Sequence, residues 1–120
     1  MIIAISSSGE TLDSPVDPRF GRAAYFVAVD SENGSFEAHS NAQNLNAAQG
    51  AGIQAAETVS RLGAEVVVTG HCGPKAFRTL SAAGIKVVTG AEGTVKDAID
   101  AFRAGILVPS DDADVESHWA

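Results

Sequence analysis

Short apolar runs alternate with turn residues along most of the chain. Four of these runs are apolar and contain β-branched side chains, and a fifth, at residues 35–40, alternates apolar and polar residues; all end beside turn residues, which is typical of strands. The expected strands cover residues 2–6, 23–30, 35–40, 65–69 and 85–89. Asn33-Gly34 separates the second run from the third, and this dipeptide predicts that the two strands form a hairpin.

Helical spacing of apolar residues appears only in the second half of the chain. Ala55, Ala56, Val59 and Leu62, for example, fall on one face of a helix that Gly63 would end. The expected helices cover residues 49–62, 74–83 and 94–104. Pro74 suits the first position of the second helix, and Thr94 with Asp97 resembles a capping box at the third. Residues 41–50 are predicted to be a mobile loop leading into the first helix.

Three strands in a meander, followed by alternating helices and strands, predict an α/β domain with a mixed five-stranded sheet. Right-handed crossovers place helices on both faces of that sheet. We expect one domain at residues 1–108 and an acidic, flexible tail at 109–120. All strands except the second should point the same way. Their carboxyl ends, with loops 6–23, 40–50, 69–74 and 89–94, then share the edge at which open α/β sheets bind ligands.

Composition narrows the function classes. The chain has 120 residues, a formal net charge of −7 and a single cysteine. An acidic surface argues against nucleic acid as a partner, and one cysteine rules out an intramolecular disulfide and suits a reducing cytosol. No apolar stretch approaches the roughly 20 residues of a membrane helix, and the N-terminal residues do not resemble a signal peptide. These features predict a cytoplasmic protein without a membrane partner.

The glycine turn after the fourth strand carries unusual chemistry. In "VVVTGHCGPKAF", Gly70 and Gly73 enclose His71 and Cys72. A related strand and turn follows twenty residues later with Ala-Glu in the same two positions, so the scaffold is not expected to require histidine and cysteine there. A free cysteine is often a small buried apolar residue, but a helix N-terminus also favours a thiolate. His39 is the other histidine expected near this edge, which leaves Cys72, His71 and His39 as candidate metal ligands without a closed four-ligand site.

The loop "LDSPVDPRFGR" places two arginines at the same edge. Arg19 and Arg22 flank Phe-Gly, and a guanidinium group suits large anions. The alternative is that Asp13 and Asp17 pair with the arginines and only hold the loop. Lys75, in the first turn of the second helix, opposes the helix dipole unless an anion is bound nearby.

Three enzyme-like alternatives are weaker. Cys72 as a nucleophile has no identifiable orienting acid, and a two-metal nuclease would need carboxylates that the first strand, "MIIAIS", lacks. "GAGIQA" at residues 50–55 fits a dinucleotide-binding pattern, but it lies about ten residues beyond the preceding strand and no acid ends the following one.

Three segments together resemble the dinitrogenase iron–molybdenum cofactor biosynthesis family, which includes NifX, NafY and the C-terminal domain of NifB. They are "VDPRFGRAAYFVAVD" (16–30), "QGAGIQAAE" (49–57) and "VVVTGHCGPKAFRTLSAAGIKV" (66–87). The resemblance covers residues 1 to about 108 and looks closest to the orange-protein branch, whose cluster is a molybdenum–copper sulfide held without covalent ligation. It implies a ribonuclease H-like α/β/α fold.

The resemblance implies a non-enzymatic carrier or scaffold for an anionic metal–sulfur cluster, of molybdenum–copper or iron–molybdenum type. Carried over by motif, the cluster-binding positions are Arg19 and Arg22 in one segment and His71, Cys72 and Lys75 in another. Backbone N–H groups at Gly70 and Gly73 would add donors suited to a polyanion. Cytosolic proteins would be the partners in cluster delivery. The alternative that remains is a metal-free module that binds a partner protein or a small anion at the same edge.

Overall fold

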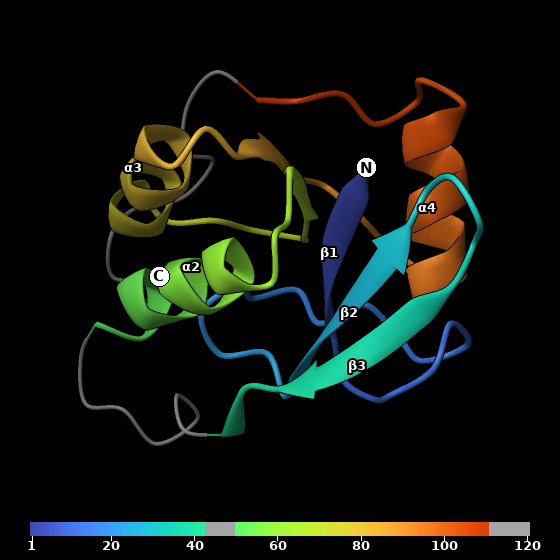
Figure 1. Cartoon of the computed structure of the whole chain (residues 1–120), viewed down its shortest axis with the longest axis horizontal. Coiled ribbons are helices and arrows are strands. Elements are labelled where there is room, and N and C mark those ends of the chain that lie inside the picture. The colour runs from blue at the N-terminus through green and yellow to red at the C-terminus, as the bar shows by residue number, and fades with distance from the viewer. Residues whose placement is uncertain (43–49, 111–120) are drawn as a thin grey trace.

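The computed structural model describes residues 1–42 and 50–110, and the expected strands and helices form there in the expected order (Figure 1). The elements are β1 (Ile2–Ser7), β2 (Tyr25–Asp30), β3 (Phe36–Ser40), α2 (Ala51–Arg61), β4 (Val66–Val68), α3 (Pro74–Ala82), β5 (Lys86–Val88) and α4 (Val95–Arg103).

The five strands make one mixed sheet in the order β3-β2-β1-β4-β5. β2 is antiparallel to both β1 and β3, whereas β1, β4 and β5 are parallel to one another. The prediction that β1, β3, β4 and β5 point the same way is therefore confirmed. Their carboxyl ends lie at one edge of the sheet, together with the glycine turn (residues 70–73) and the arginine loop (residues 12–22).

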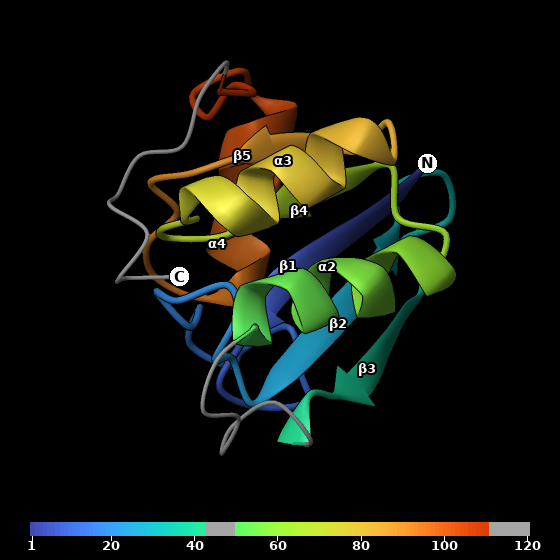
Figure 2. The same cartoon turned by 90° about the vertical axis from the view of Figure 1, so that its left-hand side faces the viewer.

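Helices cover both faces of this sheet. α2 and α3 lie side by side on one face and α4 lies on the other, which gives the three layers of the predicted α/β/α fold (Figures 1 and 2). Alternate strand residues face opposite layers. On β1, for example, Ala4 packs under α2 and α3, whereas Ile3 and Ile5 pack against α4. Burial of these apolar side chains on both faces is the main force that holds the layers together.

The β2–β3 hairpin forms, but not with a two-residue loop. Gly34 N–H donates to the carbonyl of Asp30 at 2.8 Å, and Asp30 N–H donates to the carbonyl of Ser35 at 2.9 Å, so four residues make the turn. Only Gly34 has a positive φ, 75°, whereas a type I′ turn would need Asn33 to be left-handed as well. Asn33 instead accepts the N–H of Ser35 with its side-chain oxygen, at 2.8 Å.

Two predictions about mobility fall mostly outside the described residues. Most of the proposed loop 41–50 and residues 111–120 of the proposed tail belong to this category. The first two tail residues are described, and Ser110 N–H donates to the carbonyl of Val87 at 2.7 Å. The chain therefore runs along the outer edge of β5 at this point.

Candidate functional site

Buried hydroxyl groups hold the middle of the arginine loop at the carboxyl edge. The Ser6 hydroxyl donates to the carbonyl of Asp17 at 2.7 Å and also lies 2.7 Å from Thr69 Oγ1. Asp17 N–H returns a bond to the carbonyl of Ser6 at 2.9 Å. Ser6 and Thr69 are fully buried, and they join the ends of β1 and β4 to the loop. Sequence reasoning missed both residues, although a hydroxyl directly after an apolar run was visible in each case.

The arginine loop then pairs with the glycine turn. His71 N–H donates to the carbonyl of Pro18 at 2.7 Å, and Phe20 N–H donates to the carbonyl of His71 at 3.2 Å, so Arg19 lies opposite His71 in a short parallel bridge. A Cβ on Gly70 would lie 2.7 Å from the Cα of Pro18. Glycine is required at that position because the two backbones touch, and the two motifs are thereby brought to one place.

The far end of the loop is tied to β3 and α2. Phe20 is buried and packs on Phe26 with ring centroids 5.2 Å apart. Asn41, just after β3, donates its side-chain N–H to the carbonyls of Gly21 at 3.3 Å and Ala23 at 2.8 Å. A Cβ on Gly21 would lie 2.8 Å from the backbone nitrogen of Gly52, in the first turn of α2. The loop therefore runs between the beginnings of α2 and α3.

The predicted site residues differ in exposure. Arg19, His71 and Lys75 are exposed and Arg22 is half-buried, whereas Gly70 and Gly73 are buried with the turn. Cys72 is only 1% exposed and belongs to the apolar cluster under α2 and α3. Its sulfur lies 3.7 Å from the carbonyl oxygen of Gly73. The structure thus places the thiol in the core, as in the alternative interpretation of a free cysteine.

The turn after β5 is not equivalent to the glycine turn, so the expectation that the scaffold has no need of His71 and Cys72 does not follow from it. Gly90 and Gly93 have φ values of 84° and 79°, whereas Gly73 has a φ of −73° and Gly70 is not left-handed. The two turns therefore have different backbones. In the later turn the first inner residue, Ala91, is buried and the second is exposed, which is the reverse of His71 and Cys72. The position of Cys72 is consequently a core position that the later turn does not have.

His39 does not lie beside the glycine turn. It is on β3, three strand spacings from β4 and hence about 14 Å away across the sheet. Its Nε2 lies 3.6 Å from Glu37 Oε2. Among the described residues, no group of three or more histidine, cysteine, aspartate or glutamate side chains is arranged to hold a metal ion.

Asp17 helps to hold the loop, as the alternative interpretation expected, by accepting a backbone hydrogen bond. Asp17 Oδ1 accepts the N–H of Arg19 at 3.0 Å, which closes a tight turn. Within residues 1–42 and 50–110, no ion pair joins the Arg19 guanidinium to Asp13 or Asp17. The exposed Arg19 side chain is therefore not neutralised by these two carboxylates.

α2 and α3 begin without side-chain caps. Gly50 and Gly73 are their N-cap residues, and neither first turn contains an acidic side chain. In the described part of the chain, nothing accepts a hydrogen bond from the first-turn N–H groups of α2 or α3; these are the N–H groups of Ala51, Gly52, Ile53, Lys75 and Ala76. Such donors, at the positive end of a helix dipole, are suited to anions.

The N-terminus of α4 is closed. Thr94 and Asp97 form the predicted capping box, with hydrogen bonds of 3.0 and 3.1 Å. Val95 N–H donates to Ser14 and Lys96 N–H donates to Leu12, both to carbonyl oxygens at 2.9 Å. The hydrogen bonds from the backbone N–H and the side chain of Thr94 lower the pKa of Asp97 below its ordinary value. At the edge that the sequence predicted, the arginine loop therefore covers the N-terminus of α4 and does not cover the N-termini of α2 and α3.

Residues 1–105 match the dinitrogenase iron-molybdenum cofactor family. The chain belongs to this family. It is similar to the apo form of the orange protein from Desulfovibrio gigas, with 43% identity, a TM-score of 0.93, and 95% of this chain and 96% of that one covered.

Two other relatives are more distant. TM1290, a candidate NifB protein from Thermotoga, is 40% identical, with a TM-score of 0.79 and coverage of 90% of this chain and 91% of that one. An uncharacterized protein from Methanocaldococcus jannaschii, MJ0580, is 28% identical over 94 residues, which are 77% of this chain and 80% of that protein. These likenesses agree with the resemblance seen in the three sequence motifs. In the described part of the chain, no helix is long and apolar enough to cross a bilayer.

Proposed function

We propose that the protein carries an anionic metal–sulfur cluster, bound without covalent attachment between the arginine loop and the beginnings of α2 and α3. The observation that carries this proposal is the pair of uncapped helix N-termini, whose first-turn N–H groups have no acceptor in the described residues. Family membership and the likeness to the orange protein support the same class of cargo.

The charges around this edge suit a polyanion. Arg19, Arg22 and Lys75 come from the loop and from the first turn of α3, in a protein whose net charge is −7. A cluster whose metals are saturated by sulfide needs hydrogen-bond donors and cations more than it needs protein ligands. In this proposal His71 is an exposed neighbour of the cluster, Gly70 and Gly73 shape the turn, and Cys72 packs beneath it.

The cluster is proposed to be a molybdenum–copper sulfide or a related iron–molybdenum sulfide. Copper(I) and molybdenum both prefer sulfide, so neither depends on a closed set of protein ligands. The role is that of a carrier or scaffold rather than an enzyme, and the cluster would pass to a protein partner. His39 has no part in this site, because it lies across the sheet from the glycine turn.

Reconstitution tests the proposal. The apo protein is incubated with tetrathiomolybdate and copper(I), desalted, and examined by visible absorption and by metal and sulfide analysis. We expect the wild-type protein to retain a coloured cluster, and Arg19→Ala and Arg22→Ala to retain less. The loss should grow at high salt, because exposed charge interactions are screened. Arg61→Ala, at the opposite end of α2, is the matched control and should behave as wild type.

The competing function is a metal-free module that binds a partner protein or a small anion at this edge. It predicts a colourless protein after the same incubation and desalting. Equal cluster retention by wild type and both loop variants, at low and high salt, would also contradict the electrostatic site.

A further inference from the structure

The two edge strands of the sheet, β5 and β3, differ in whether described residues cover their outer side. At the outer edge of β5, Ser110 N–H donates to the carbonyl of Val87, so the chain itself covers this edge. β3 is the strand at the other edge, and all five of its residues are exposed or half-buried. An uncovered edge strand presents a row of backbone donors and acceptors to any strand that can pair with it.

The outward-facing residues of β3 can be identified from its bonds to β2. Asp30 N–H donates to the carbonyl of Ser35, and Asn41 N–H donates to the carbonyl of Ala24. In an antiparallel pair the direction of these bonds alternates along the strand, so odd-numbered residues of β3 face β2. The backbone groups of Phe36, Ala38 and Ser40 therefore point outward, and none of them has a hydrogen-bond partner in the described residues.

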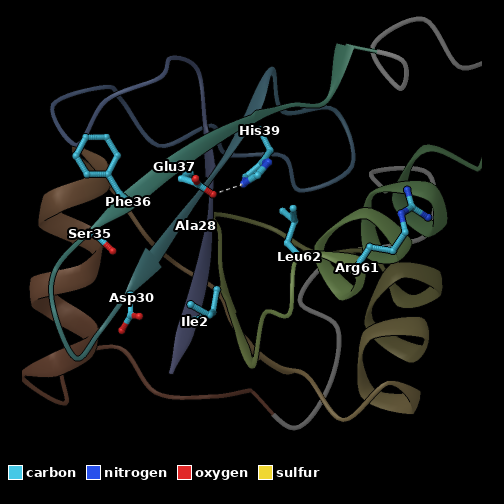
Figure 3. A pocket seen from close by; sticks show the side chains of 9 residues that line it. All are labelled: Ile2, Ala28, Asp30, Ser35, Phe36, Glu37, His39, Arg61 and Leu62. Carbon is cyan, nitrogen blue, oxygen red and sulfur yellow. Dashed lines mark ion pairs between the residues drawn. The ribbon is translucent and has the colours of Figure 1, made fainter.

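Glu37 and His39 flank Ala38 on β3, so the strand is complementary to an antiparallel copy of itself. Glu37 and His39 lie on the same face, beside a groove of about 560 Å³ that also borders Arg61 and Leu62 of α2 (Figure 3). Within one chain, His39 Nε2 already lies 3.6 Å from Glu37 Oε2. If a second β3 is placed antiparallel with Ala38 opposite Ala38, each Glu37 lies directly opposite the other copy's His39.

The same register satisfies the backbone. Ala38 pairs with its counterpart and Phe36 pairs with Ser40, which makes about six hydrogen bonds from the outward-facing groups. Glu37 and His39 then form non-hydrogen-bonded pairs, in which side chains approach most closely. Each Glu37 would then have two histidine neighbours, the His39 of its own strand and the His39 of the other copy. On the opposite face the Phe36 ring, 41% exposed in one chain, would gain contacts.

We propose that β3 is a self-association edge, through which two copies of this chain join their sheets into one continuous antiparallel sheet with Ala38 on the two-fold axis. This interface lies on β3, away from the arginine loop, and does not depend on the proposed cluster.

Charge reversal with complementation tests the register. Glu37→Lys and His39→Glu each place like charges or unpaired charges across the interface, so each variant alone should dimerise at least about tenfold more weakly than wild type. In a 1:1 mixture the introduced lysine of one chain faces the introduced glutamate of the other, and a heterodimer should form. Sedimentation equilibrium up to about 1 mM measures each sample. Glu57→Lys and Gln54→Glu, exposed on α2, are the matched charge controls and should dimerise as wild type does.

Two further measurements address the backbone. Hydrogen exchange should show that the amides of Phe36, Ala38 and Ser40 become protected as concentration rises, while those of Glu37 and His39 change little because they already bond to β2. Ala38→Pro should abolish dimerisation and still fold, since proline is tolerated where an edge-strand N–H points outward. Its fold is checked by circular dichroism, and the charge variants decide the question if it does not fold.

A wild-type protein that stays monomeric at about 1 mM, or a mixture that associates no better than its separate components, would overturn the proposal. Protection of the three amides only when a different protein is added would assign the edge to a partner strand instead. A dimer that persists in Ala38→Pro would place the interface elsewhere on the molecule.

Discussion

At the level of single residues, the adjacent side chains of His71 and Cys72 in the glycine turn lie in different environments. His71 is exposed and its backbone pairs with the arginine loop, whereas Cys72 points into the core at 1% exposure. A thiol in such a place acts first as a packing group, because it lies among the apolar side chains of the cluster under α2 and α3. The contribution of Cys72 is therefore expected to be one of stability.

We predict that Cys72→Ser lowers the free energy of unfolding of the apo protein by about 1–3 kcal/mol, because a hydroxyl replaces a thiol at a buried site. Cys72→Ala should lower it by a similar amount, because removal of the sulfur leaves a small void in the apolar cluster. Urea unfolding of the apo protein measures both. Folded Cys72→Ala should still retain the cluster. Loss of the cluster from this variant, with apo stability unchanged, would show instead that the sulfur is a ligand.

Asp97 predicts a specific pH dependence. Hydrogen bonds from Thr94 lower the pKa of this carboxyl in the folded protein, so its stabilising effect is complete above its unfolded pKa of about 4 and is lost as the pH falls through the folded value. The stability difference between wild type and Asp97→Asn should accordingly shrink below about pH 4. Urea unfolding between pH 7 and pH 3 measures it. Asp100→Asn, which removes the same charge from the same helix, is the control, and an equally large change in that variant would contradict the assignment.

At the level of secondary-structure elements, the three described helices differ at their N-termini. α4 has its own carboxylate and receives carbonyl oxygens from the loop, whereas α2 and α3 have neither an acidic first turn nor a side-chain cap. Natural helices usually satisfy these donors locally. Within residues 1–42 and 50–110, the N-termini of α2 and α3 thus have no acceptors like those of α4, which is consistent with a role other than stability.

Lys75 allows this interpretation to be tested, because stability and binding should change in opposite directions. We predict that Lys75→Glu stabilises the apo protein by about 0.3–1 kcal/mol, since a negative charge in the first turn of α3 interacts favourably with the helix dipole. The same variant should retain less cluster. Thermal unfolding and reconstitution measure the two effects, and Lys86→Glu, exposed on β5, is the charge-matched control. Lower stability together with unchanged binding would contradict the role of the open N-termini.

The elements themselves were well predicted from the sequence, and their details were not. Alternating apolar runs and glycine stops identified every described strand and helix, because burial and helix ends leave local signals. The hairpin loop was harder, since Asn-Gly favours a two-residue turn but here only Gly34 is left-handed. The repeat after β5 was misleading for a similar reason. Two turns with the same glycine spacing have different backbones, and the loop packed against Gly70 is far away in the sequence.

For the whole molecule, the candidate site depends on contacts between distant segments. The sequence predicted that the arginine loop and the glycine turn share one edge of the sheet, and the structure pairs Arg19 with His71 there. It could not show that the loop covers α4 and leaves α2 and α3 open, because this depends on where Ser14 and Leu12 lie in space. It also could not separate His39 from the glycine turn, since strand order decides that distance. Ser6, Thr69 and Asn41 were missed because they act on the loop through buried hydrogen bonds.

This arrangement makes binding and global stability interdependent. The loop joins β1, β4 and both open helices, so a cluster bound there contacts segments that come apart on unfolding. A ligand that binds only the folded state stabilises it by about 2.7 kcal/mol at a free concentration one hundred times its Kd. We therefore predict that loading with thiomolybdate and copper raises the Tm of wild type, with a smaller rise in Arg19→Ala and Arg22→Ala. Scanning calorimetry of loaded and apo samples measures this, and Arg61→Ala should show the full rise. Equal Tm values for loaded and apo wild type, despite retained colour, would mean that the cluster binds outside this junction.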